Sequence, residues 1–441
     1  MILAVALHVL AYNNNAPHSR LPPLGWASWV ALGPPPCEAT SECMKLARLS
    51  GANHPVFDYC DEAGVKAAAD AVVKLGFVDA GYRHFHLDDC WAGPRNSTGF
   101  LTPEADHFPN GMKVVADYVH SKGLSFGLYT CAGTETCVGG RPGSKDHWTQ
   151  DANVFAEWGV DWVKMDWCNT QGMHPREAYG NMSQALNATG RPISFNMCEW
   201  GRENPWEWGG DIANSWRMSG DHTGIWASTK KQIASSAAIP PAGTGKPWGW
   251  NDMDMLETGN YEQAAHANGK ESNMTALEYK TEFGMWAISA SPLVVTTPVM
   301  NCSNATGPVV CEPWISELQK EILFNTEIIA INQDVTPQGR PICDHEVPYC
   351  LNRWSRALSD GSYAVALYNP DDAPAELSID FGALGMPATQ RATVRDLWAK
   401  KTLGVFDGRY PASGGVTVAP HEAKMLRVTP AGEAEGAEYA F

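Results

Sequence analysis

Acidic side chains end five stretches of the sequence that are otherwise typical of short buried strands. They are Asp88 and Asp89 in HFHLDDCW, Asp166 in WVKMDWC, Glu199 in NMCEW, Asp221 in SWRMSGD, and Asp252 and Asp254 in WNDMDM. A single aspartate after a strand is by default a cap for the next helix. Five strands that end in acids are hard to explain by capping, and they predict a ring of carboxylates.

Such a ring could hold a divalent metal, cleave a glycosidic bond or abstract a proton. Hard metal ions favour carboxylates with few competing cations, whereas Lys164 and Arg217 stand beside these acids. Glycosidic cleavage needs two carboxyl groups in different protonation states. The residues therefore favour glycoside hydrolysis, with no metal and no cofactor.

The stretch WVKMDWCNT (162–170) carries two charges inside a strand-like run. Because a strand points alternate residues to opposite faces, Trp162, Lys164 and Asp166 are expected to share one face. A structural ion pair is the simpler interpretation, although desolvation makes such pairs weak stabilisers. The alternative is that Lys164 lowers the pKa of Asp166 and keeps a nucleophile ionised, with Asp221 as the acid.

The chain holds eighteen tryptophans, and three of them lie close to the acidic strand ends: Trp29, Trp91 and Trp200. A tryptophan alone is more often part of the core than a ligand platform. Their shared position favours stacking on the apolar faces of a sugar.

Strand-like runs alternate with helical patterns from about residue 25 to 335. The strands are expected at 25–29, 84–89, 125–130, 162–166, 193–200, 214–221, 248–255 and 291–297, and helical patterns at 62–77, 111–123 and 315–332. Eight strands with intervening helices predict a parallel (β/α)8 TIM barrel. An open doubly wound sheet is less consistent, because no Gly-rich phosphate loop follows any strand.

Short alternating runs separated by Gly, Pro and Asp begin after about residue 338, and they predict a C-terminal antiparallel β-sandwich. The expected domains are a weak signal peptide at 1–20, the barrel at 22–337 and the sandwich at 338–441. The stretch 31–58 is expected to be an inserted surface loop.

The formal net charge of -17 argues against a phosphate-binding surface, so no nucleic-acid partner is expected. Twelve cysteines and six Asn-X-Ser/Thr sequons predict a secreted or vacuolar/lysosomal glycoprotein. No run outside the N-terminal segment is long and apolar enough to span a bilayer. Three close cysteine pairs are expected to staple loops: Cys37–Cys43, Cys302–Cys311 and Cys343–Cys350.

The motifs GWASW, LDDCW, WVKMDWC, CEW, SWRMSGD, WNDMDML and INQD occur in an order that resembles the α-galactosidase family, glycoside hydrolase family 27. The resemblance covers about residues 22–430. It implies a retaining exo-α-galactosidase, active as a monomer or homodimer, in which Asp166 is the nucleophile and Asp221 the general acid/base. A retaining pair is expected ~5–5.5 Å apart.

The resemblance also implies contacts with the sugar. Asp88 and Asp89 would accept from the hydroxyls at C6 and C4, Lys164 and Arg217 would donate to the others, and Trp29 would form a wall near C6. The remaining pocket residues would be Tyr129, Cys137, Cys198, Trp200 and Met255. Cys60–Cys90 and Cys137–Cys168 would be disulfides.

The sequence departs from the family in four places, none of which touches the proposed acids. Cys131 replaces an aspartate that is common in relatives, Met253 replaces a proline, and the 31–58 insertion is longer than expected. Cys131 and Cys198 have no obvious disulfide partners. These changes leave the reaction class intact and bear on loop shape and aglycone preference.

Two features favour galactose over other sugars of the family. An enzyme for a pentopyranose has no C6 hydroxyl to bind and should lack the first acid, yet Asp88 is present. Glu199 and Trp200 are large, and we expect them to exclude an N-acetyl group. The alternatives are an α-N-acetylgalactosaminidase, a β-L-arabinopyranosidase, a catalytically inactive sugar-binding protein and a metal-dependent lyase or aldolase.

Overall fold

The computed structural model describes residues 16, 19–29, 31, 60–239, 249–260, 274–303, 310–342 and 350–431. Nearly all of the expected insertion at 31–58, with its Cys37–Cys43 pair, and nearly all of the expected signal peptide lie outside this part of the chain. None of the helices within it is both long enough and apolar enough to cross a membrane.

Eight parallel strands form the first sheet, as the sequence predicts. They are β1 (Leu24–Ala27), β2 (His84–Leu87), β3 (Ser125–Cys131), β4 (Trp162–Asp166), β5 (Ser194–Cys198), β6 (Ser215–Arg217), β7 (Trp250–Asp252) and β8 (Leu293–Val295). Neighbouring strands follow the order β7-β6-β5-β4-β3-β2-β1-β8. The fold is therefore the predicted (β/α)8 barrel, with strands that succeed one another around a closed wall.

The barrel closes between β7 and β8 through Leu256, which lies four residues beyond the end of β7. The backbone N–H of Leu256 donates to the Val294 carbonyl at 2.8 Å, and the Leu256 carbonyl accepts from the Thr296 N–H at 3.1 Å. The chain reaches this position through Asp254, whose φ is +85°. The seam of the barrel thus runs through the segment that follows β7.

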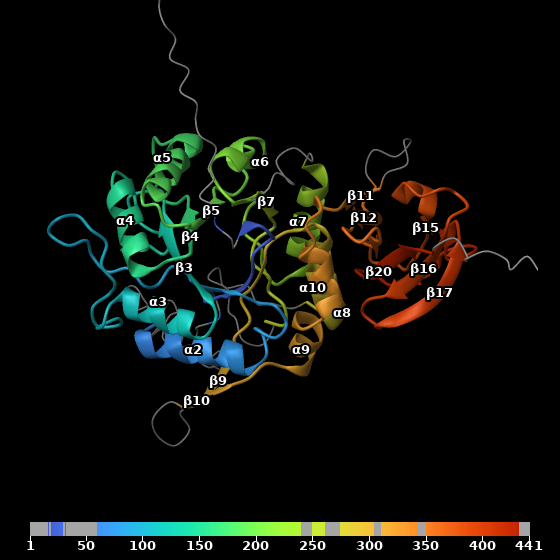
Figure 1. The fold of residues 1–441 in the computed structure, drawn as a ribbon, viewed down its shortest axis with the longest axis horizontal. Helices are drawn as coiled ribbons and strands as arrows, with labels where there is room; N and C mark the ends of the chain where they lie inside the picture. The colour runs from blue at the N-terminus through green and yellow to red at the C-terminus, as the bar shows by residue number, and fades with distance from the viewer. Residues whose placement is uncertain are drawn as a thin grey trace, which may run out of the picture.

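Helices surround the barrel (Figure 1). They are α2 (Glu62–Lys74), α3 (Met112–Ser121), α4 (Trp148–Trp158), α5 (Pro175–Ala188), α6 (Pro205–Trp208) with the 3-10 turn η3 (Gly209–Asp211), α7 (Trp226–Ala238), α8 (Ala276–Ile288), α9 (Glu317–Leu323) and α10 (Thr326–Asn332). A short hairpin of β9 (Met300–Ser303) and β10 (Val310–Pro313) precedes α9, and its register places Cys302 opposite Cys311.

The alternation expected in β4 is present. Trp162 packs with Ala27 and Val294 inside the barrel, whereas Val163 and Met165 belong to the core between the sheet and the helices. Lys164 and Asp166 therefore point to the inner face with Trp162.

The helical pattern at 315–332 forms two helices rather than one. Asn325 interrupts it, because its side chain accepts from the backbone N–H groups of Glu327 and Ile328 and so caps α10. The same side chain donates to the Leu397 carbonyl at 3.0 Å. The second contact comes from the C-terminal domain, and it holds the capping side chain in place.

The C-terminal region is an antiparallel β-sandwich, as predicted. Its elements are β11 (Arg340–Pro341), β12 (Arg353–Ala357), β13 (Tyr363–Tyr368), β14 (Ala375–Leu377), β15 (Ile379–Asp380), η4 (Phe381–Leu384), β16 (Arg391–Asp396), β17 (Lys401–Asp407), β18 (Arg409–Tyr410), β19 (Val416–Val418) and β20 (Ala423–Pro430). One layer has the order β11-β12-β13-β20-β16-β17, and the pairs β14–β19 and β15–β18 accompany it. Apolar side chains of both parts form a separate core.

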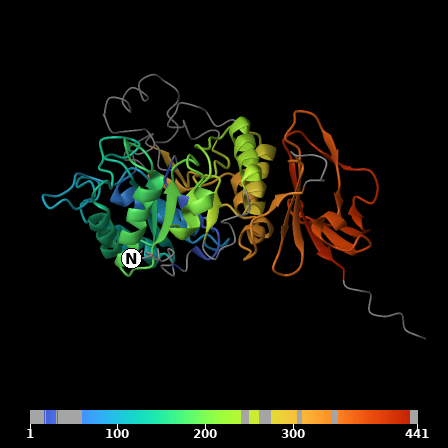
Figure 2. The same cartoon turned by 90° about the horizontal axis from the view of Figure 1, so that it is seen from above.

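The helices α7, α8 and α10 stand between the barrel and the sandwich in both views (Figures 1 and 2). Helix α8 is buried on nearly every side, which fits a position between two domains. Arg356, from β12, is buried and donates to the carbonyls of five residues at and beyond the end of α10: Ile331, Asn332, Asp334, Thr336 and Pro337. The sandwich thus satisfies carbonyl groups that the helix end leaves open.

Both disulfides implied by the resemblance are present, Cys60–Cys90 and Cys137–Cys168. Cys350 is disulfide-bonded, and its expected partner Cys343 lies outside the described residues. Cys131 and Cys198 are buried free thiols.

Candidate active site

A cavity of about 350 Å³ opens at the carboxyl ends of the barrel strands. This end of a TIM barrel carries the active site in characterised enzymes of the fold. The cavity is lined by Trp29, Asp88, Tyr129, Cys137, Val138, Lys164, Asp166, Cys168, Trp200, Arg217, Asp221, His222, Asp254, Met255 and Glu257. Loops that follow different strands, and that lie far apart in the sequence, therefore meet in one pocket of small-molecule size.

Asp166 ends β4, and its carboxylate is held by two donors. The Tyr129 hydroxyl lies 3.1 Å from Oδ2, and the Trp167 backbone N–H lies 2.8 Å from Oδ1. Burial raises the pKa of Asp166, while the nearby charge of Lys164 acts in the opposite direction. The fixed donors and the ammonium favour the ionised form that a nucleophile requires.

Lys164 forms its ion pair with Asp88 and not with Asp166, which corrects the simplest interpretation of the WVKMD stretch. Its Nζ lies 2.9 Å from Asp88 Oδ2, and His86 Nε2 lies 3.3 Å from the same oxygen. Burial alone would raise the pKa of Asp88, but Lys164 and His86 hold it well below its usual range. For Lys164 the directions are reversed: burial alone would lower its pKa, but the negative charge of Asp88 raises that pKa above its usual range.

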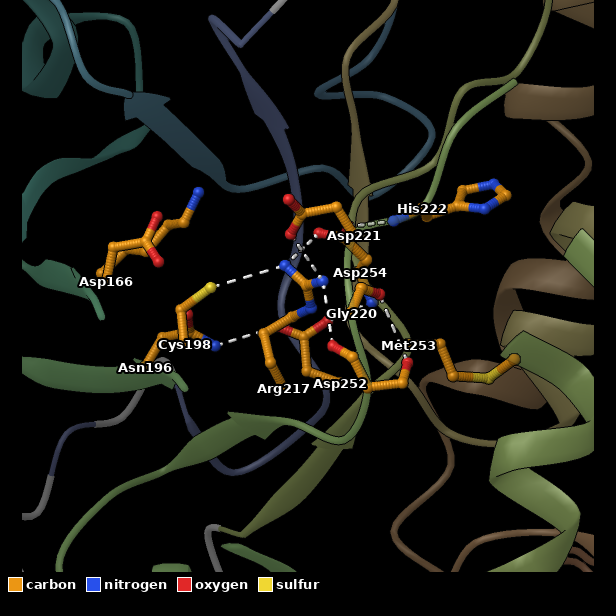
Figure 3. Close-up of polar contacts among 12 residues, drawn as sticks. Asp166, Asn196, Cys198, Arg217, Gly220, Asp221, His222, Asp252, Met253 and Asp254 are labelled. Atoms are coloured by element: carbon orange, nitrogen blue, oxygen red, sulfur yellow. Dashed lines mark hydrogen bonds and ion pairs between the residues drawn. The ribbon is translucent and has the colours of Figure 1, made fainter. Parts of the chain in front are cut away.

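Arg217, at the end of β6, lies between two carboxylates on the other side of the site (Figure 3). Its guanidinium lies 3.1 Å from Asp221 Oδ1 and 2.8 Å from Asp254 Oδ1. Asp254 also accepts from the His222 backbone N–H at 2.7 Å. Burial raises the pKa of Asp254, against the opposing charge of Arg217. Asp221 differs from these buried groups, because 61% of its side chain is exposed.

Three residues expected in the pocket do not line the cavity. Asp89 turns aside to accept from the Val138 backbone N–H at 3.1 Å, and Cys198 is buried with its sulfur 3.4 Å from Arg217 Nη1. Glu199 is fully buried and folds back on its own loop, where Oε2 accepts from the Glu203 N–H at 3.1 Å. Burial raises the pKa values of Asp89 and Glu199 to about 7.

The three tryptophans selected from the sequence have different positions. Trp29 and Trp200 line the cavity, but Trp91 belongs to the core, where it packs against Phe155 and Trp158. Trp200 has a φ of +60°, which is unusual for a large side chain. The turn at Trp200 aims the indole at the cavity while the preceding Glu199 points away from it.

Several lining residues were missed by sequence reasoning. Val138, Cys168, His222 and Glu257 were not selected, and Asp254 was noted as an acid without a contact. Cys168 could have been found, because the Cys137–Cys168 disulfide places both cysteines together. His222 follows Asp221 directly, and its position next to a candidate acid was an available signal.

Cys137, Cys168 and Asp166 bring two sulfur atoms and a carboxylate oxygen within 4.8 Å of one another. This grouping does not suit a metal ion, because the two sulfurs are joined in a disulfide. A disulfide sulfur is not the thiolate that metal ions bind. The disulfide instead forms part of the cavity wall beside Asp166.

The arrangement offers a buried carboxylate with fixed donors, an exposed carboxyl group across from it, and several charged hydrogen-bond partners. Figure 3 shows Asp166 on one side and Asp221 next to Arg217 on the other. A carboxylate nucleophile with a solvent-accessible acid/base suits displacement at an acetal carbon. Indole faces and charged groups in the same cavity suit a polyhydroxylated ring.

Comparison with known proteins gives consistent matches. A family model described as alpha galactosidase A matches residues 53–334, and one described as the alpha galactosidase C-terminal beta sandwich domain matches residues 350–428. An α-galactosidase of Oryza sativa subsp. japonica is 36% identical over 93% of this chain and 85% of its own length. That of Coffea arabica is 37% identical over 93% and 94%, respectively.

Solved structures agree with the sequence matches. α-Galactosidase I from Mortierella vinacea superposes with a TM-score of 0.76 at 28% identity, over 94% of this chain and 98% of the other. The α-galactosidase of Saccharomyces cerevisiae, solved with raffinose, gives a TM-score of 0.73 at 26% identity, over 96% and 99%.

Proposed function

Because this chain belongs to the α-galactosidase family, we propose that it is a retaining exo-α-galactosidase that removes terminal α-linked galactose from oligosaccharides or glycoconjugates. The observation that carries the proposal is that Asp166 and Asp221 line one cavity, each with a distinct environment. Asp166 is buried with fixed donors, and Asp221 is open to solvent. A nucleophile and an acid/base need this difference.

In the first step, an Asp166 oxygen attacks the anomeric carbon and the bond from that carbon to the leaving oxygen breaks. Asp221 gives its proton to the leaving oxygen, which departs as an alcohol. In the second step, the Asp221 carboxylate takes a proton from water, whose oxygen attacks the anomeric carbon. The ester bond to Asp166 breaks, and galactose leaves with its original α configuration.

The remaining lining residues supply hydrogen bonds and shape. Asp88, with its charge balanced by Lys164, is proposed to accept from a sugar hydroxyl, and Arg217 to donate to one while it holds Asp221. Trp29 and Trp200 offer apolar faces, and Tyr129 orients Asp166. Asp89 contributes indirectly, since it fixes the Val138 segment of the wall.

Hydrolysis of a panel of aryl glycosides tests the proposal, with the first-formed product anomer followed by NMR. We expect turnover of the aryl α-galactoside with α-galactose formed first. β-Galactose as the first product would contradict retention. Faster turnover of the α-N-acetylgalactosaminide or the β-L-arabinopyranoside would show that one of these, and not the α-galactoside, is the preferred substrate. Binding without turnover would indicate an inactive sugar-binding protein.

We further propose that the chain enters the secretory pathway, carries N-linked glycans and is secreted or vacuolar/lysosomal, as a monomer or homodimer. Its disulfides support an oxidising compartment. Three sequon asparagines, Asn96, Asn181 and Asn187, are exposed and accessible to modification. Peptide mapping of the protein purified from the organism that makes it should find glycans and disulfides. Light scattering measures the oligomeric state. Twelve free thiols would contradict this proposal.

A further inference from the structure

Glu282, on helix α8, is a completely buried carboxylate that lies outside the cavity lining. It binds the segments that follow two different barrel strands. Its Oε1 lies 2.8 Å from His222 Nε2, after β6, and accepts from the Glu257 backbone N–H at 2.9 Å, after β7. Its Oε2 accepts from the Thr258 hydroxyl at 2.8 Å. One side chain therefore joins the two segments that carry Asp221 and Asp254.

The imidazole of His222 is fixed from its other side as well. His222 Nδ1 lies 3.0 Å from Ser228 Oγ, which also accepts from the Thr223 backbone N–H at 3.0 Å. Because that oxygen is already an acceptor, its hydroxyl proton is available to His222 Nδ1. Nδ1 is then the acceptor, so the network assigns the single ring proton to Nε2, which donates it to Glu282 Oε1. The ring also packs on Trp286, with centroids 5.1 Å apart.

The fixed ring sets the backbone next to the acid/base candidate. The His222 backbone N–H donates to Asp254 Oδ2 at 2.7 Å, so this residue is held through both its backbone and its side chain. Asp221 immediately precedes it, and the Asp221 side chain is largely exposed, with an ion pair to Arg217 at 3.1 Å. The position of the Asp221 main chain therefore depends on how firmly His222 is held.

We propose that Glu282 is a positioning residue for the reaction, which holds Asp221 in place through the His222 side chain. The inference rests on the proposed function, because it takes Asp221 to be the general acid/base. Glu282 acts at a distance from the sugar and ties the segments after β6 and β7 together. Without its carboxylate, His222 Nε2, the Glu257 N–H and the Thr258 hydroxyl would all lose an acceptor in a buried place.

The test compares two substrates whose leaving groups differ in how much they need to be protonated by the general acid. Glu282→Ala is assayed with 2,4-dinitrophenyl α-galactoside, whose leaving group needs no proton, and with raffinose, whose leaving group does. Because a misplaced catalytic group can cost up to about 100-fold, we expect kcat for raffinose to fall by about that factor. The dinitrophenyl substrate should lose much less, with little change in KM for either.

A conservative variant and a control on the same helix separate positioning from general damage. In Glu282→Gln the amide oxygen can still accept from His222 and Glu257, and the amide N–H₂ can donate to Thr258, so kcat should recover to within about threefold of the wild type. Glu278→Ala removes another buried carboxylate of α8, which binds His421 at 2.6 Å on the sandwich side. It should lower stability and leave the ratio of the two kcat values unchanged.

Ser228→Ala provides a milder variant that keeps the measurement available if Glu282→Ala does not fold. It removes the contact to His222 Nδ1 at a partly exposed position, and it should shift the same ratio in the same direction. An equal loss on both substrates in Glu282→Ala, or an unchanged ratio in Ser228→Ala, would overturn the positioning role. Wild-type turnover is measured first and bears on the α-galactosidase activity itself, so the two proposals fail through different measurements.

Discussion

The ammonium of Lys164, two residues before Asp166 on β4, lies 2.9 Å from the carboxylate of Asp88, which follows β2. Both partners are buried, and His86 approaches the same Asp88 oxygen. Both residues line the cavity, and their opposite charges balance each other. The pair can offer both an acceptor and a donor to a sugar without leaving an isolated charge.

Removing one member of this ion pair should destabilise the folded chain more than replacing both members. Lys164→Met leaves the Asp88 carboxylate buried without its main partner, and we expect a loss of about 3–5 kcal/mol in the free energy of unfolding. Adding Asp88→Asn to the same chain should recover part of that loss, because no uncompensated charge remains. Urea denaturation of the single and double variants measures this. Strictly additive losses would show that the two groups do not depend on each other.

Asp166→Ala should reduce turnover by ~10⁴-fold or more, because it removes the nucleophile. Azide occupies the space of the lost carboxylate and attacks the anomeric carbon directly, so the expected product is β-galactosyl azide. Product NMR identifies it. Turnover close to that of the wild type would rule Asp166 out as the nucleophile.

Asp221→Asn should also respond to azide, but with the opposite anomer as product. The enzyme can still form the glycosyl intermediate from substrates with good leaving groups, since these need no protonation. Azide then attacks that intermediate, and the product is α-galactosyl azide. Equal losses for activated and unactivated substrates would contradict an acid/base role for this residue.

Trp200→Ala should admit larger groups at the edge of the pocket. We expect the ratio of kcat/KM for the α-N-acetylgalactosaminide over the α-galactoside to rise by about tenfold or more, because the indole lines the cavity. Glu199→Ser is the matched control, since the Glu199 side chain points away from the cavity, and it should leave the ratio nearly unchanged. A larger change in Glu199→Ser than in Trp200→Ala would reverse this assignment.

Stability should fall as the pH rises from about 4 to 7, in part because of Asp89. Burial raises the pKa of this carboxyl to about 7 in the folded chain. Between its ordinary value and 7, the unfolded chain releases the proton while the folded chain keeps it, so folding is favoured below this window and less favoured above it. The effect is at most about 4 kcal/mol. In Asp89→Asn, a plot of Tm against pH should be flatter over this window, and an unchanged slope would contradict the assignment.

The strands and the ring of acids could be predicted because both follow from local patterns. Alternation in β4 fixed which face carries Lys164 and Asp166, and the barrel places all the strand ends at one opening. The directions of Asp89 and Glu199 could not be predicted, because each depends on the turn after its strand. At Glu199 that turn includes the left-handed conformation of Trp200.

Contacts between distant segments account for the other differences. Asn325 divides a continuous helical pattern by capping α10, and its side chain also donates to the carbonyl of Leu397, 72 residues away. Glu282 gave no local signal, because α8 is buried on most sides and its partner His222 lies 60 residues earlier. Such residues become recognisable only once the loops after β6 and β7 are placed next to the helix.

The buried guanidinium of Arg356 has a consequence for how this chain can be divided. A protein whose second domain is an accessory can be shortened at the linker, and the first domain then keeps its own surface. Here the last barrel helix ends in carbonyl groups that are satisfied by a side chain of the second domain. Cutting the chain between α10 and β12 would leave these carbonyl groups without their donor. The sandwich therefore supports the end of the barrel, and the two domains should be expressed and engineered as a single unit.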